Sequence, residues 1–569
     1  MRKILAGILF AFGIGLWLNA ADVPEKVDLA IAHRIRDEAF GTHSRVMDTA
    51  FYLTDVYGPR LTGSPEIKTA ADWAVKKMTE WGLSNTKIEP WNGGTGTFGS
   101  GWSCTRFVAL MKEPGFQPII GFARPWSPGT NGDVTGEAVM ATIATPEDME
   151  KWRGKLKGKI LLSTAPHADI EPTEPLSVRL TDAELAAAAL APDPASGNPS
   201  ILPLGFSRLS PAGGGGGRGA AAAGGRAGAA GRGGAGGRAG ADGRGGAGGR
   251  GFQATLNKFL KDEGVLVVLT PGSGSPDGGT VVGQSAGSQN PDQEGPPPSA
   301  AIANEHYNRI ARLLEKNIKV TLEFDIETKF TEPQNSFNIT AEIPGSDPNG
   351  GLVMVGGHFD SWTGGTGATD NAAGSVVAME TMRILKTLNL KMPRTVRIAL
   401  WTGEEQGILG SRAYVKEHFA DPADMKPKPE HGKLSAYYNL DNGTGKIRGV
   451  YLQDNDQVRP IFEAWLAPFS DLGASTLTIR NTGSTDHVSF DSVGLDAFQF
   501  IQDPLDYGSR THHSNMDLYD RLQASDLEQA SAIMAWFAYN TAVRPEMLPR
   551  KPMPQPGQGR GGRGGGRGE

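Results

Sequence analysis

The chain of 569 residues has a single cysteine, Cys104, so it cannot form an intrachain disulfide. Without disulfides, its stability must come from a large core or from bound metal. No motif around Cys104 supplies a catalytic partner, and the expectation is a buried structural cysteine.

Long apolar runs are also scarce. The run 4–18 follows the basic pair Arg2 and Lys3, is too short for a normal membrane span, and ends near the small residue Ala20. This pattern predicts a signal peptide over 1–20 that is removed from the mature chain. We therefore expect a secreted or periplasmic protein that is not an integral membrane protein after cleavage.

The net charge of −6 understates how acidic the body of the chain is. The segment 212–251 is almost entirely Gly, Ala and Arg, and the tail 550–569 is Pro-rich and then Arg-Gly-rich. Both segments are basic, cannot build a core and are predicted to be disordered. They lack the aromatic residues that, interleaved with basic ones, bind single-stranded nucleic acid, so no nucleic-acid partner is required.

From residue 338 onward the chain alternates between apolar strands and helical patterns. The strands are predicted at 352–355, 395–401, 436–440 and 495–500, and a helix at 371–389. An earlier helix is predicted at 70–81, and short strands near 157–163 and 264–269. The alternation indicates an α/β fold with a largely parallel sheet that is buried on both faces.

Five potential metal ligands follow these strands or lie in the loops nearby: His358, Asp370, Glu405, Asp441 and His513. An open α/β sheet places its site at these strand ends. The set offers each of two metals one histidine and one terminal carboxylate, with one aspartate left as a bridge. Mixed imidazole and carboxylate ligands favour two Zn²⁺ ions, although Mn²⁺ and Co²⁺ use similar ligands.

The remaining polar residues of these motifs receive supporting roles. Asp370 is assigned as the bridging ligand, although an aspartate at a helix start is also a normal N-cap. Asp360 is expected to hydrogen-bond the ring of His358 and fix its tautomer. Adjacent side chains point in different directions, so Glu404 and Glu405 can have different roles. Glu405 is assigned to the metal, and Glu404 is assigned as the general base.

His487 lies in the run 484–490 and could donate a hydrogen bond to a developing oxyanion. A purely structural histidine is nearly as good an interpretation. Neighbouring His512 competes with His513 as the last ligand.

Six short motifs occur together, at 57–64, 357–362, 369–374, 401–407, 440–444 and 512–514. Jointly they resemble the zinc aminopeptidase family of co-catalytic di-zinc exopeptidases, and most closely its plasma glutamate carboxypeptidase-like branch. The resemblance implies a phosphorylase/hydrolase-like three-layer α/β sandwich with an inserted β-rich protease-associated domain. It selects His513 over His512, because the family's last histidine lies four residues before an aspartate.

The resemblance also implies domain boundaries. Residues 21–130 would form the N-terminal part of the peptidase domain, 131–325 the inserted protease-associated domain, and 326–549 the catalytic zinc peptidase domain. The long segment 212–251 is not a family feature. The branch favours, weakly, a homodimer.

The function that follows is a secreted di-zinc metallo-exopeptidase that removes N-terminal residues from short peptides or dipeptides. A water molecule between the metals would attack, Glu404 would move the proton, and one zinc would hold the free amine. A carboxypeptidase, a glutaminyl cyclase and a non-catalytic peptide-binding receptor on the same scaffold remain as alternatives.

Overall fold

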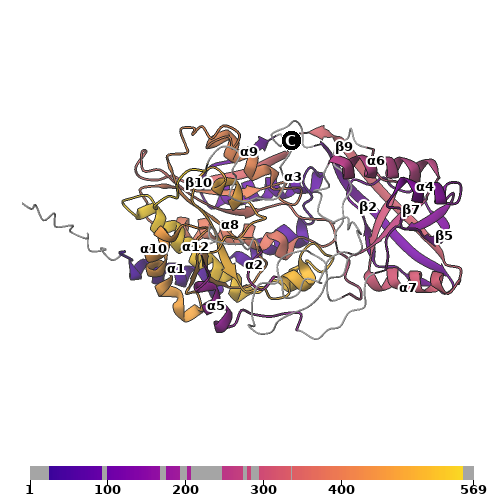
Figure 1. The fold of residues 1–569 in the computed structure, drawn as a ribbon. Coiled ribbons are helices and arrows are strands. Elements are labelled where there is room, and N and C mark those ends of the chain that lie inside the picture. Colours follow the sequence, from indigo (N-terminus) through magenta and orange to yellow (C-terminus); the bar gives the residue numbers. More distant parts are fainter. Residues whose placement is uncertain are drawn as a thin grey trace, which may run out of the picture.

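The computed structural model describes residues 25–91, 99–166, 175–192, 202–206, 247–272, 278–283, 294–334 and 336–554. The predicted signal peptide at 1–20 lies outside these ranges. Within them, no helix combines the length and the apolar character that crossing a membrane requires. The chain forms two lobes, each built around an eight-stranded sheet (Figure 1).

The sheet of the first lobe has the strand order β1-β10-β12-β11-β13-β16-β14-β15. The four adjacent strands β12, β11, β13 and β16 are mutually parallel and form its centre. The bounds are β1 (Ser84–Trp91), β10 (Ser336–Ile343), β11 (Leu352–His358), β12 (Thr395–Trp401), β13 (Leu434–Asn439), β14 (Ile447–Tyr451), β15 (Thr476–Thr478) and β16 (Ala497–Gln502).

Helices cover both faces of this sheet. On one face Val353 and Val355 of β11 share a core with helices α1 (Leu29–Ala39), α2 (Val46–Phe51), α3 (Pro65–Glu80), α8 (Ala373–Thr387), α10 (Arg459–Leu466) and α12 (Ala524–Val543). Leu352 and Met354 point the other way, toward α9 (Leu409–His418) and α11 (His487–Asp491). This alternation confirms the predicted α/β fold with layers on both sides of a largely parallel sheet.

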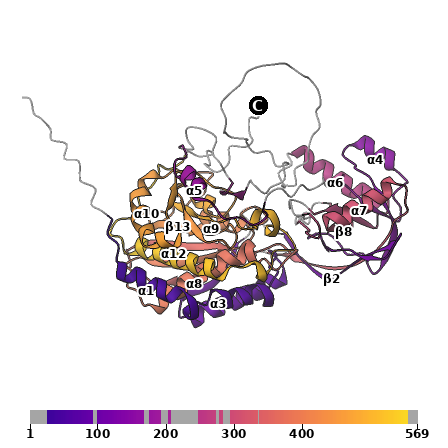
Figure 2. The same cartoon turned by 90° about the horizontal axis from the view of Figure 1, so that it is seen from below.

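The second lobe lies on the right of Figure 1 and is seen from below in Figure 2. Its strand order is β3-β2-β9-β5-β6-β7-β8-β4, and its centre is the parallel group β5, β6, β7 and β8. Its elements are β2 (Gly99–Glu113), β3 (Gln117–Pro118), β4 (Gly121–Ala123), β5 (Val134–Met140), α4 (Pro146–Trp152), β6 (Lys159–Leu162), α6 (Ala247–Asp262), β7 (Val267–Pro271), β8 (Ser299–Ile302), α7 (Asn304–Glu315) and β9 (Thr321–Gln334). Helix α7 packs on one face, and α4 and α6 pack on the other.

The pairing of the second sheet moves the expected boundaries. Because β2 pairs with β9 along most of its length, this lobe extends from Gly99 to Gln334 rather than from 131 to 325. The long β2–β9 pairing could not be read from local pattern, since its partners are more than two hundred residues apart.

Part of the expected insert packs on the first lobe instead. Residues 175–192 and 202–206, here called the strap, include helix α5 (Asp182–Ala189) and contact the β14–β15–β16 edge. Thr478 of β15 donates a hydrogen bond to the carbonyl of Ala188 at 2.5 Å. Assignment of the whole stretch 131–325 to one separate domain therefore does not describe its packing.

Three local expectations also change. Cys104 is exposed on β2 rather than buried, within a run of three exposed residues, 104–106, where the register of the β2–β9 pairing shifts. Of the segment 212–251, residues 212–246 lie outside the described ranges, and the last five residues begin helix α6. Residues 550–554 of the predicted tail are described, and Lys551 is buried against Asp491.

Candidate metal centre

All five predicted ligands meet at one edge of the first sheet. His358 is the last residue of β11, Glu405 follows β12, Asp441 follows β13, and His513 lies in the loop beyond β16. Asp370 lies in the helical turn η5 (Ala368–Ala372), immediately before α8. The carboxyl ends of neighbouring parallel strands share an edge, and so four distant motifs converge there.

One group of three ligands is fully enclosed. The Nε2 atom of His358 lies 3.2 Å from Oδ1 of Asp370 and 3.3 Å from Oδ1 of Asp441. These three side chains are among those whose ligand atoms lie close enough to hold one metal ion. Their charges act on the imidazole: burial alone would lower its pKa, but Asp441, Asp360 and Asp370 together raise the pKa of His358 well above its ordinary value.

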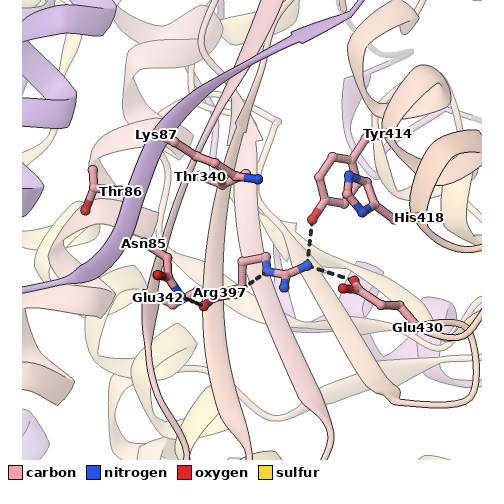
Figure 3. A pocket seen from close by; sticks show the side chains of 9 residues that line it. All are labelled: Asn85, Thr86, Lys87, Thr340, Glu342, Arg397, Tyr414, His418 and Glu430. Atoms are coloured by element: carbon pink, nitrogen blue, oxygen red, sulfur yellow. Dashed lines mark hydrogen bonds and ion pairs between the residues drawn. The ribbon is translucent and has the colours of Figure 1, made fainter.

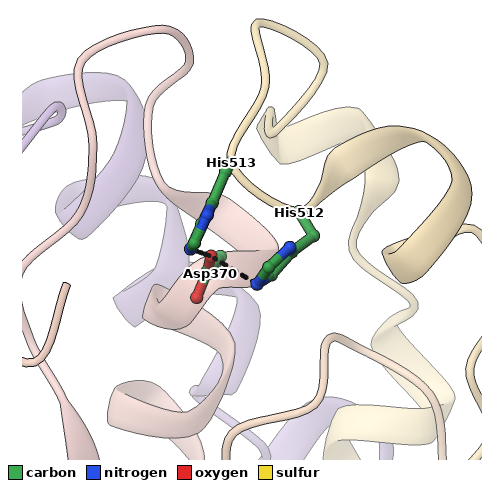
Figure 4. Close-up of side chains that lie close together, drawn as sticks. All are labelled: Asp370, His512 and His513. Atoms are coloured by element: carbon green, nitrogen blue, oxygen red, sulfur yellow. Dashed lines mark ion pairs between the residues drawn. The ribbon is translucent and has the colours of Figure 1, made fainter. Parts of the chain in front are cut away.

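A second group gathers on the other oxygen of Asp370. The Nε2 atom of His513 lies 3.3 Å from Oδ2 of Asp370 and 2.9 Å from Oε2 of Glu405. Figure 4 shows His513 and His512 both directed toward Asp370. The Nε2 atom of His512 is farther away, at 3.9 Å from the same oxygen. The distances therefore favour His513, which also adopts a left-handed backbone conformation with φ +56°.

The donor set fits a metal pair. Four buried carboxylate oxygens of the centre, namely Oδ2 of Asp370, both oxygens of Glu405 and Oδ1 of Asp441, accept no hydrogen bond from the described residues, although three of them lie within 3.3 Å of an imidazole Nε2. Buried carboxylates without partners are costly unless a cation neutralises them. Asp370 presents one oxygen to each group, which is the geometry of a bridging ligand, and the imidazole and carboxylate donors suit zinc.

Asp360 orients the imidazole of His358 in the first ligand group, which consists of His358, Asp370 and Asp441. Its backbone carbonyl accepts from Nδ1 of His358 at 3.0 Å, and its carboxylate lies 3.5 Å from the same nitrogen. This arrangement leaves Nε2 of His358 directed at the two ligand carboxylates. The Asp360 carboxylate also accepts from the hydroxyl of Thr62 at 2.8 Å and from the backbone N–H groups of Glu404 and Glu405. One residue thus ties the β11 and β12 loops together.

Asp370 is not the N-cap of α8, contrary to the alternative considered from sequence. That helix begins at Ala373, and the carboxamide oxygen of Asn371 accepts from the backbone N–H of Gly374 at 2.8 Å. Asp517, four residues after His513, accepts from the hydroxyl of Thr369 at 2.9 Å and from the backbone of Asp370 at 3.3 Å. The carboxylate of Asp370 faces His358 with one oxygen and His513 with the other.

Arg60 is the main supporting residue that the sequence interpretation did not assign. Its guanidinium is fully buried and donates to the backbone carbonyls of Phe359 and Gly367 at 2.7 and 2.9 Å, and also to those of Leu53 and Thr366. Burial lowers its pKa to about 10, against the charges of nearby acids that include Asp517, Asp360 and Asp370. Arg60 lies in the motif 57–64, so the sequence drew attention to this region, but it did not predict that the side chain is fully buried.

Glu404 follows the tight turn at Gly403, where φ is +74° and a β-carbon would lie 2.9 Å from the ring of Trp91. The half-buried carboxyl lies in the field of several other acids. Burial, with Asp441, Asp486 and Glu405 acting in the same direction, raises the pKa of Glu404 well above its usual value. A carboxyl in this environment is the kind that serves as a general base.

His487 is buried at the start of α11 and is held from inside the protein. Its Nε2 atom lies 3.0 Å from the carbonyl oxygen of Thr482 and 2.8 Å from the carboxamide nitrogen of Gln453. Burial lowers its pKa to about 4, so the ring is neutral at physiological pH. These contacts favour the structural interpretation, and its role as an oxyanion donor stays a prediction. Neighbouring Asp486, which sequence reasoning passed over, is buried with its pKa raised by burial to about 7.

A separate pocket of about 390 Å³ lies beside β1, β10, β12 and α9 (Figure 3). None of the five ligands lines it. Its central cation, Arg397, is already held by Glu342 at 2.7 Å, Tyr414 at 2.7 Å and Glu430 at 3.0 Å. These bonds explain the cluster as a stabilising ion-pair network.

Comparison with known proteins defines the class to which this fold and site belong. Residues 338–538, which hold all five ligands and Glu404, match the family described as Peptidase family M28. The chain is 31% identical over 260 residues to carboxypeptidase Q of Mus musculus, covering 45% of this chain and 53% of that protein. It therefore spans about half the length of the curated relatives that it matches.

Two solved structures share the fold. The peptidase M28 precursor from Shewanella amazonensis SB2B superposes with a TM-score of 0.61 at 23% identity, over 92% of this chain and 98% of that chain. The zinc aminopeptidase BSAP from Bacillus subtilis superposes with a TM-score of 0.50 at 18% identity, over 88% and 95% of the two chains. The predicted resemblance is confirmed: residues 338–538 match the M28 metallopeptidases, and the chain is similar to carboxypeptidase Q in sequence and to two peptidase structures in fold.

Proposed function

We propose that the protein is a di-zinc exopeptidase that removes N-terminal residues from short peptides or dipeptides. The observation that carries the proposal is the bridging position of Asp370, whose two oxygens face two separate groups of ligands. Glu404 adjoins the candidate ligand Glu405 on the same loop, and its carboxyl interacts electrostatically with His358, Asp441 and Glu405, which supports its choice as the base.

Each residue has a defined task in this proposal. His358 and Asp441 would hold one zinc ion, Glu405 and His513 the other, and Asp370 both. When bound, the two ions would polarise the scissile carbonyl and lower the pKa of the attacking water. The Glu404 carboxylate accepts a proton from that water and returns it to the leaving amine. Asp360 keeps Nδ1 of His358 occupied, so that Nε2 stays available as a ligand atom.

We also propose export. The basic pair and apolar run at 1–20 are typical of a signal peptide, and the predicted destination is the periplasm or the medium. The second lobe stays our prediction of a protease-associated domain, with the boundaries that its sheet pairing indicates.

A carboxypeptidase is the second candidate, because the curated relatives at 31% identity carry that name. The two activities use the same metal ligands and differ in which peptide terminus must be free. The glutaminyl cyclase and receptor alternatives share the scaffold but predict no peptide hydrolysis.

The test is hydrolysis of a panel of dipeptides, each with a free or an acetylated N-terminus, by zinc-loaded protein. We expect cleavage of the free-amine members only, and a loss of ~10²–10⁴-fold in kcat for Glu404→Gln. The matched control is Glu417→Gln, which changes an exposed glutamate of α9 and is expected to leave the rates unchanged. The metal content of each variant, measured by atomic emission, should be two zinc ions per chain.

Other outcomes select the alternatives. Cleavage of acetylated peptides would make the protein a carboxypeptidase. Absence of hydrolysis with two bound zinc ions would reject the exopeptidase, and ammonia release from an N-terminal glutamine peptide would then identify the cyclase.

A further inference from the structure

The residues of the metal centre differ in their exposure to solvent. The side chains of His358, Asp370, Glu405 and Asp441 are at most 7% exposed, whereas those of His512 and His513 are 32% and 39% exposed. A peptide can therefore approach the centre past the two histidines. Whatever flanks these imidazoles is in the path of the substrate.

Aromatic rings flank the two histidines on both sides. The imidazoles of His512 and His513 are stacked at 3.7 Å, and Trp362 meets His513 edge-on with the ring centres 6.3 Å apart. On the opposite side Tyr507 lies 4.9 Å from His512, and Phe206 lies 5.3 Å from it at an interplanar angle of 89°. The rings form a continuous wall around the open side of the centre.

Phe206 differs from the rest of this wall because it does not come from the metal-binding part of the chain. It belongs to the strap, which follows β6 of the second lobe. The ring also contacts Tyr507, with centres 6.1 Å apart, and a β-carbon on Gly508 would lie 3.3 Å from it. Phe206 is only partly buried, so part of its ring faces solvent beside His512.

The residues next to Phe206 pack on the first lobe: the backbone N–H of Leu204 donates to the hydroxyl of Tyr451 at 2.7 Å, and a β-carbon on Gly205 would lie 2.7 Å from Pro504. The earlier part of the strap is attached to the same lobe. Val178 pairs with Leu505, and the backbone N–H of Leu180 donates to Asp503 at 3.0 Å. Arg179 bonds to Asp503 at 2.8 Å and to Asp526 at 2.7 Å. Asp503 is fully buried, so the pair is shielded from solvent on one side. These contacts attach the strap to the same loop, 503–513, that delivers His513.

We propose that Phe206 is a specificity-determining residue that forms one wall of the pocket for the substrate side chain next to the scissile bond. The inference rests on the proposed exopeptidase function and adds the substrate class, namely peptides with a bulky apolar residue at that position. The physical reason is that a partly buried phenyl ring beside the exposed imidazole of His512 gains contact area from an apolar side chain and little from a small one.

The test compares two dipeptides, Phe-Gly and Ala-Gly, with wild type and Phe206→Ala. We expect kcat/KM for Phe-Gly to fall by roughly tenfold or more, because a lost apolar contact in a pocket has an effect of this size. The fall should come through KM, since the contact is present before and during reaction. For Ala-Gly the change should stay within about threefold, on the same reasoning.

Two further variants make the comparison decisive. Phe206→Gln keeps the length of the side chain but removes the apolar ring, and should lower the Phe-Gly to Ala-Gly ratio in the same direction if the alanine variant does not fold. Phe116→Ala removes a 70% exposed phenyl ring elsewhere in the second lobe and should leave the ratio unchanged. Zinc content and melting temperature are measured for every variant.

The failures of the two proposals are distinguishable. If wild type cleaves neither peptide, the exopeptidase function is wrong. If wild type is active but the Phe206 variants leave the ratio unchanged, or lower both substrates equally, Phe206 only supports the loop and the specificity inference is overturned.

Discussion

The two lobes have similar cores but different strand ends. Each sheet has four neighbouring parallel strands at its centre, with helices on both faces. In the first lobe, these strands end at or lead into the ligands His358, Glu405 and Asp441. In the second lobe, the residues that follow the parallel strands are Ala141, Ser163, Gly272 and Ala303.

This difference shows that the carboxyl ends of parallel strands provide a position for a functional site, whereas the residues at those ends supply its chemistry. The same strand arrangement carries the candidate metal ligands in the first lobe, and in the described part of the second lobe it is followed directly by small, uncharged residues. The second lobe contacts the loop that carries His513, because the backbone N–H of Val282 donates to the carboxamide oxygen of Asn515 at 2.8 Å.

The largest expected effect comes from the inner ligand group. His358→Ala removes the nitrogen between Asp370 and Asp441, leaving two buried carboxylates facing each other. We expect kcat/KM to fall by ~10³-fold, which corresponds to several kcal/mol of lost electrostatic stabilisation, and one zinc ion to be lost. Peptide hydrolysis and zinc content measure this. His306→Ala in the second lobe is the control, and an equal loss there would break the contrast between the lobes.

The next effect concerns stability. Arg60→Met keeps an unbranched apolar chain but removes the guanidinium that donates to four carbonyl oxygens, in three buried hydrogen bonds and one part-buried one. We expect a loss of ~3 kcal/mol in the free energy of unfolding, because removing one side of a buried charged network exposes the other side to its full desolvation cost. Urea unfolding measures it. Arg312→Met in the second lobe, where both Arg312 and its partner Glu305 are more than half exposed, should not move the midpoint.

A smaller effect is expected inside the second lobe. The hydroxyl of buried Tyr307 donates to the carbonyl of Thr164 at 2.7 Å and accepts from its backbone N–H at 3.1 Å. Tyr307→Phe should cost ~1 kcal/mol of stability and leave peptide hydrolysis unchanged. A change in kcat would show that the core of this lobe is coupled to the metal centre.

The smallest effect tests the far edge of the catalytic sheet. Burial acts to raise the pKa of Glu89, but hydrogen bonds with His418 and Lys87 hold the pKa at about 2. Since the folded pKa is depressed, the stability from this group is present above about pH 4.5 and is lost as the pH falls toward 2. Glu89→Gln should cost ~1 kcal/mol at pH 6, because solvent screens the pair, and almost nothing near pH 2. Unfolding midpoints across this range would contradict the assignment if the difference did not shrink.

Much of the first lobe was predictable from local pattern. The strand 395–401 coincides with β12, and the other three strands were placed within a few residues, because apolar runs of this length between turns are typical of buried parallel strands. The second lobe was harder to delimit, since β2 reads as part of the N-terminal region until its partner β9 is known.

In the candidate site, too, some residues could be predicted from local sequence and others could not. Residue type and position after strands predicted the five candidate ligands and Glu404, and the structure brings the five candidate ligands together. Arg60, Asp486 and the strap did not, because their importance comes from burial and from contacts with distant segments.

By itself, the sequence determined which residues can bind metal and that strands deliver them to one edge. The tertiary structure alone decided that Asp370 turns one oxygen to each ligand group, that His513 lies nearer than His512, and that Phe206 joins the wall. The physical reason is that hydrophobic period and turn residues act within a few residues along the chain. Distances between side chains hundreds of residues apart depend on how whole layers pack.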